Sequence, residues 1–138
     1  MNFCLEALSI FENKLGKNSH YYTLALGSLA DNHYKRNDID SAIIIEEQII
    51  EISKEVFSPC HREVLVGLTN ITDLYNEVNK FNKSLSILQE VLLLADNCHG
   101  RNNDIYINAL EDIAVQYYIM NDNNKASEYF SSLFVVGF

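Results

Sequence analysis

The sequence predicts an all-α protein in which antiparallel helical hairpins stack into a solenoid, with about 3.5 repeats of 42 residues. Residue columns recur at that fixed spacing, each window carries apolar residues at helical intervals, and an Asn returns at the same place in every window. Each hairpin of such an array buries one face against its neighbours, so the stacked repeats share a continuous core.

Three windows align when the sequence is shifted by 42 residues. They read LALGSLADNHYKRNDIDSA from Leu24, VGLTNITDLYNEVNKFNKS from Val66 and NALEDIAVQYYIMNDNNKA from Asn108. The large columns lie three and four residues apart, as on one helical face, and are Leu26, Leu68 and Leu110, then Leu29, Ile71 and Ile113, then His33, Tyr75 and Tyr117. A small column, where a neighbouring helix can approach closely, holds Ala30, Thr72 and Ala114.

Asn37, Asn79 and Asn121 follow these faces, and Asn tolerates the left-handed conformation that often ends a helix. A second helix then begins near a small column, Ala42, Ser84 and Ala126. Its apolar columns are Ile45, Ile87 and Tyr129, then Ile49, Val91 and Leu133, then Ile52, Leu94 and Val136. In the same register Phe3, Ala7 and Ile10 belong to a second helix, so the chain opens on half a hairpin.

The predicted helices cover residues 2–15, 20–36, 39–57, 61–78, 81–98, 103–120 and 123–136. We expect one domain over residues 1–138, made of a half repeat at 1–18 and repeats at 19–60, 61–102 and 103–138. A fragment of a longer array is the alternative, because the chain opens on an unpaired second helix and closes on the apolar run LFVVGF.

Composition excludes several classes of partner and location. The formal net charge of -9 argues against nucleic acid and anionic membranes, which attract surfaces rich in Lys and Arg. No apolar run approaches the roughly 20 residues of a membrane-spanning helix, and the N-terminus lacks the basic start of a signal peptide. Cys4, Cys60 and Cys98 are odd in number and widely spaced, unlike a disulfide framework, which favours a reducing, cytoplasmic compartment.

Chemistry-bearing residues do not form a catalytic pattern. Cys60-His61 and Cys98-His99 resemble pairs of zinc ligands, but they sit at different phases of the repeat and need not converge. Glycines are scattered, so no phosphate-binding loop is predicted. Carboxylate pairs such as Glu46-Glu47 and Glu111-Asp112 fit solvated helix faces. We expect no enzyme activity, no cofactor and no metal.

The pattern Leu-x-x-[Leu/Ile]-[small]-x-x-[His/Tyr], followed by a turn residue and a small residue, resembles the tetratricopeptide repeat. The 42-residue period and joints such as LGKNSHYY and FSPCHREV resemble the kinesin light chain type, although Asn replaces the usual Gly at the turns. The resemblance implies a right-handed superhelix whose first helices line a concave groove. The implied groove residues are Leu24, Gly27, Ser28, Asp31, Tyr34, Lys35, Val66, Thr69, Asn70, Asp73, Asn76, Glu77, Asn108, Glu111, Asp112, Val115, Tyr118 and Ile119.

This groove would hold five carboxylates and one cation, Lys35, so we expect it to bind a basic or mixed basic-apolar peptide or helix of a partner protein. Asn70 could grip a peptide main chain, since a carboxamide both donates and accepts hydrogen bonds. The kinesin light chain type instead uses basic groove residues for acidic peptides. A structural or self-associating solenoid joined through apolar ends is the alternative, and a regulatory peptide sensor carries less weight.

Overall fold

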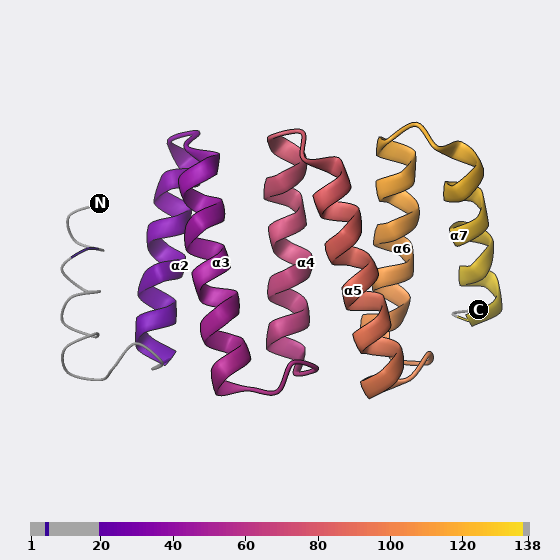
Figure 1. Cartoon of the computed structure of the whole chain (residues 1–138), viewed down its shortest axis with the longest axis horizontal. Coiled ribbons are helices and arrows are strands. Elements are labelled where there is room, and N and C mark those ends of the chain that lie inside the picture. The colour runs from indigo at the N-terminus through magenta and orange to yellow at the C-terminus, as the bar shows by residue number, and fades with distance from the viewer. Residues whose placement is uncertain (1–4, 6–19, 137–138) are drawn as a thin grey trace. The chain divides into compact units, whose positions relative to one another are not determined.

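The computed structural model describes residue 5 and residues 20–136, and this part of the chain contains six α-helices (Figure 1). They are α2 (His20–Lys35), α3 (Ile39–Val56), α4 (Arg62–Glu77), α5 (Phe81–His99), α6 (Asp104–Ile119) and α7 (Asn123–Val136). All six agree with the predicted helices to within one residue at each end. The predicted half repeat at 1–18, with Phe3, Ala7 and Ile10, lies outside the described residues.

Several helices begin at a polar side chain that accepts a hydrogen bond from one of the first free backbone N–H groups. Asp38 accepts from Ser41 at 3.3 Å before α3, and Asn103 accepts from Ile105 at 2.8 Å before α6. The His61 ring accepts from the Glu63 N–H through Nδ1 at 3.1 Å before α4. These caps fix where three of the hairpins' helices begin.

The turn inside each hairpin is an Asn in the left-handed region. Asn37, Asn79 and Asn121 have φ values of 64°, 63° and 64°, which confirms the prediction from their recurrence. The residue after each Asn donates its N–H to a carbonyl five residues back, for example from Lys80 to Tyr75 at 2.8 Å. This bond closes the end of each first helix and directs the chain into the second.

The described helices group into two compact units. In the unit of Met1–Ser58, α2 packs against α3. Leu26, Leu29 and Ala30 of α2 are buried with Ile45 of α3, and the partly buried residues packed against them are Tyr22, Ile49 and Ile52. The predicted columns therefore form the core of this hairpin.

In the unit of Pro59–Phe138, α4 packs against α5, α5 against α6 and α6 against α7, and α4 also contacts α6 (Figure 1). The core includes the predicted large columns, which are Leu68, Ile71, Tyr75, Leu110, Ile113 and Tyr117. The small columns Thr72, Ser84, Ala114 and Ala126 are buried as well. The Ser84 hydroxyl donates to the Thr72 carbonyl at 3.0 Å, so small side chains let α4 and α5 approach closely.

Cys60 and Cys98 form a disulfide, with their Cα atoms 6.1 Å apart. The expectation that these cysteines need not converge was wrong. Cys60 lies just before α4 and Cys98 lies near the end of α5, and antiparallel packing brings those two ends of the hairpin together. The position of a residue within the repeat relates equivalent residues of different hairpins, and it does not predict a contact between the two helices of one hairpin. The pair also removes the cysteine-based argument for a reducing compartment.

Within residue 5 and residues 20–136, no helix is both long and apolar enough to cross a membrane. In the same residues, no group of three or more His, Cys, Asp or Glu side chains could hold a metal ion.

Candidate functional site

The groove positions implied by the repeat all lie on accessible faces of the first helices. In α2, the Ser28, Asp31, Tyr34 and Lys35 side chains are exposed, opposite the face that packs on α3. Asp31 on this face of α2 also lies near an acidic residue of α3. Glu46 of α3 is half-buried, and burial together with nearby Asp31 raises the pKa of its carboxyl group. The expectation that Glu46 lies on a fully solvated helix face therefore does not hold.

In the second unit, two first helices contribute exposed side chains to one candidate surface, here called the acidic face. Its residues are Val66, Asn70, Asp73 and Glu77 of α4, and Asn108, Glu111, Asp112, Val115 and Tyr118 of α6. All are exposed except Asp112, which is half-buried. Because α4 contacts α6 directly, residues of both helices come close at this face.

Asp112 is the most perturbed group of the acidic face. Its pKa rises from 3.8 to about 6, first because the carboxyl group is partly buried and then because Glu111 and Asp73 place negative charge beside it. Thus Asp73 of α4 and Asp112 of α6, predicted separately from their columns, act on one another. At neutral pH, three carboxylates share this site, which a cation would stabilise.

A pair of amides fixes the two helices that carry the acidic face. Asn76 and Gln116 exchange two hydrogen bonds, at 2.9 and 3.0 Å, and Gln116 also donates to the Phe81 carbonyl at 3.3 Å. Gln116 is only 2% exposed, so its bonds are made away from water. Asn76, predicted as a groove residue, therefore holds α4 to α6.

Sequence reasoning missed Gln116, because its column contains Leu74 and Asn32 and shows no repeat. The one signal is an amide in the apolar run IAVQYYI, where a polar residue needs a partner once it is buried.

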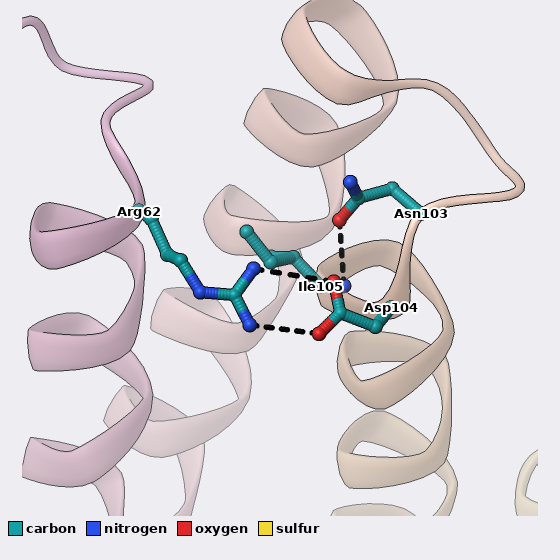
Figure 2. A network of polar contacts seen from close by, with 4 residues as sticks. All are labelled: Arg62, Asn103, Asp104 and Ile105. Atoms are coloured by element: carbon teal, nitrogen blue, oxygen red, sulfur yellow. Dashed lines mark hydrogen bonds and ion pairs between the residues drawn. The ribbon is translucent and has the colours of Figure 1, made fainter.

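Arg62 and Asp104 join the first turns of α4 and α6 (Figure 2). The guanidinium donates from Nη1 to Oδ1 at 3.2 Å and from Nη2 to Oδ2 at 2.7 Å. Asn103, beside this pair, caps α6 through the Ile105 N–H. Opposite charges 42 residues apart were a signal that the repeat could have revealed. Arg62 is the sole basic residue of α4 and α6, and it is engaged in this ion pair.

No family model matches the sequence, and no curated protein matches it. Solved structures do match. A putative kinesin light chain from Podosopora anserina, with nearly identical TPR-like repeats, superposes with a TM-score of 0.78 at 12% identity. This match covers 98% of the present chain and 64% of the other. The fold is therefore tetratricopeptide-like.

BtubC (BKLC) from P. vanneervenii also matches, with a TM-score of 0.76 at 19% identity. It covers 98% of this chain and 53% of that protein. The chain thus spans between half and two thirds of the length of these two structures. Both matches agree with the resemblance to the kinesin light chain type of repeat that the 42-residue period indicated. At these identities the agreement concerns the fold alone.

Proposed function

We propose that this chain is a non-catalytic protein-interaction module and that its acidic face binds a basic or mixed basic-apolar segment of a partner protein. The observation that carries the proposal is the meeting of Asp73, Glu111 and Asp112 on two adjacent first helices. A Lys or Arg side chain at this place would relieve the repulsion among the three carboxylates. Binding of that cation would therefore lower the pKa of Asp112 and favour its ionised form.

Apolar side chains beside the carboxylates extend the proposed ligand beyond a single charge. Val66 is 43% exposed, Val115 is 41% exposed and Tyr118 is 66% exposed. These side chains offer area to aliphatic groups of a ligand, including the methylene stems of Lys and Arg. Asn70 is exposed on the same helix as Asp73 and offers a carboxamide to a peptide main chain.

The test is a titration of a fluorescent peptide of alternating Lys, Arg and Leu, monitored by anisotropy, with a Glu, Asp and Leu peptide as the comparison ligand. Asp112→Asn and Asp73→Asn should each weaken binding of the basic peptide by about 5-fold, the effect of losing roughly 1 kcal/mol. Glu90→Gln is the matched control. It removes one charge from an exposed residue of the second helix α5 and should change affinity much less.

Equal weakening by all three substitutions would mean that net charge alone attracts the peptide, and the acidic face would lose its assignment. Preference for the acidic peptide would refute the proposed ligand chemistry.

A further inference from the structure

The Cys60–Cys98 disulfide closes the open end of the α4–α5 hairpin. Cys60 lies two residues before α4 begins at Arg62, and Cys98 is the second-last residue of α5, so both lie at the same end of the hairpin (Figure 1). The two cysteines are 38 residues apart in the sequence, so the bond encloses both helices. No residue of the acidic face takes part in it, and its role therefore has to follow from its own chemistry.

The two cysteines differ in their access to solvent. Cys98 is exposed, whereas Cys60 is only half-buried at its place before α4. His99, next to Cys98, donates through Nε2 to the Cys60 carbonyl oxygen at 2.7 Å, so the last residue of α5 lies against Cys60. A thiolate arriving from solvent therefore reaches the Cys98 sulfur more readily than the Cys60 sulfur.

The surroundings of the two sulfurs favour the same direction of attack. When a thiolate attacks one sulfur of a disulfide, the other leaves as a thiolate, and it leaves faster when its negative charge is stabilised. Cys60 directly precedes His61, the residue that caps the N-terminus of α4, and this positive end of a helix stabilises an anion. Cys98 lies at the negative end of α5 and two residues after Asp96. Cys60 is thus the better leaving group.

Other contacts hold the start of α4 in place without the disulfide. Val64 and Leu65 are both 0% exposed, which anchors the first turn of α4 in the core. Arg62 is bound to Asp104 of α6 by two hydrogen bonds (Figure 2). In contrast, the last three residues of α5 are all exposed. Opening of the disulfide should therefore loosen the last turn of α5 and leave α4 where it is.

We propose that the Cys60–Cys98 bond is an exchange site for a dithiol reductant of the thiol–disulfide oxidoreductase class, attacked at Cys98, and that its opening loosens the last turn of α5 while the chain stays folded. One thiolate of the reductant bonds to the Cys98 sulfur, the disulfide breaks, and its electron pair leaves on the Cys60 sulfur. The second thiolate of the reductant then displaces Cys98 from the mixed disulfide. Both protons of the reductant pass to the cysteines, and the reductant ends as a disulfide.

Dithiothreitol serves as the dithiol probe, and Cys4→Ser removes the third cysteine from the full chain. The mass of the intact chain should show a disulfide before treatment and free thiols after it, without any denaturant. Circular dichroism should retain the helical signal. Amide exchange in the last turn of α5 should become about 10-fold faster, whereas exchange around Ile71 and Tyr75 of α4 should change much less. No peptide ligand is used, so the outcome is independent of the acidic face.

Glutathione, a monothiol, identifies the sulfur that is attacked. Acid stops the exchange early, at the mixed disulfide, and N-ethylmaleimide then blocks the thiol that was released. Mass spectrometry of the peptides should find glutathione on Cys98 and the blocking group on Cys60 about 10-fold more often than the reverse arrangement.

Two further substitutions in the Cys4→Ser chain separate the disulfide from its surroundings. Cys98→Ser should reproduce the fast exchange of the reduced chain and should abolish the response to dithiothreitol. Asn97→Ser is the matched control, because it changes the neighbouring exposed residue of the same turn and should leave the response intact.

Four results would overturn the proposal. One is a chain whose cysteines are already free thiols before treatment, and another is a disulfide that dithiothreitol reduces only in denaturant. The third is glutathione found mainly on Cys60. The fourth is loss of the helical signal on reduction, because the bond would then hold the whole fold together and could not act as a local switch.

Discussion

Arg62 and Asp104 lie 42 residues apart and form a two-pronged ion pair between the first turns of α4 and α6 (Figure 2). The two hydrogen bonds hold equivalent ends of consecutive first helices together. The hydrogen bonds from Arg62, followed in effect by its positive charge, lower the pKa of the Asp104 carboxyl group. Both side chains are more than half exposed, which limits what the pair contributes in water.

Arg62→Ala should therefore lower the unfolding midpoint only slightly, and the difference from the natural chain should shrink in 1 M salt, where exposed charges are screened. Because the pKa of Asp104 is lowered in the folded state, the contribution is present above 3.8 and is lost as the pH falls through the lowered pKa. Thermal melts at low and high salt check this. A loss that is equally large at both salt concentrations would mean that Arg62 acts through packing and not through charge.

Asn76→Ala should cost more than Arg62→Ala, because it leaves the buried Gln116 without two hydrogen bonds. We expect a loss of about 1–3 kcal/mol in the free energy of unfolding, measured by urea denaturation. Asn70→Ala changes the same residue type at an exposed site of the same helix and should stay within about 0.5 kcal/mol of the natural chain. Similar losses at both positions would contradict the structural role of the Asn76–Gln116 pair.

Asn79→Ala should destabilise the second unit by about 1 kcal/mol, because alanine is strained at the positive φ of 63° that the turn requires. Asn79→Gly should change the free energy of unfolding much less, since glycine adopts this conformation without strain. Asn82→Ala is the control, because Asn82 is an exposed residue within α5. If urea denaturation shows that Asn79→Gly has a lower free energy of unfolding than Asn79→Ala, the positive φ does not explain why Asn is present at this position.

Asp112→Asn should stabilise the chain at neutral pH while weakening the proposed ligand. The raised pKa of about 6 means that the folded protein favours the neutral carboxyl group. Its favourable contribution is complete below 3.8 and is lost as the pH rises through about 6. Allowing for partial exposure, the gain at pH 7 should be on the order of 1 kcal/mol. Melts from pH 4 to 8 should converge at the acidic end, and parallel curves would contradict the shift.

The same ionisation gives the proposed binding a pH dependence. Affinity for a Lys- and Arg-containing peptide should fall as the pH drops below about 6, because Asp112 becomes neutral. The Asp112→Asn variant should show a flatter profile over this range. Anisotropy titrations at pH 5 and 7.5 measure the difference.

Local sequence patterns were sufficient to predict the repeat, because each hairpin packs its helices in the same way. The columns of Leu68, Ile71 and Tyr75 predicted which side of α4 is buried. Asn79 marked the turn, since few other residues tolerate its backbone conformation. The same repeat register predicted the accessible residues of the candidate site, because they lie on the sides of the first helices that are not buried. What they bind stays a prediction.

Contacts between different columns depended on the tertiary structure. Cys60 meets Cys98 because antiparallel helices place the start of one beside the end of the next, and Gln116 finds Asn76 because α4 and α6 pack directly. The pKa of Asp112 likewise depends on partial burial and on Asp73 of another helix. The sequence by itself thus determined the period, the helices and their buried sides, which are local and repeated. The tertiary structure decided the pairing of cysteines, amides and carboxylates, which depends on distances between helices that no single repeat contains.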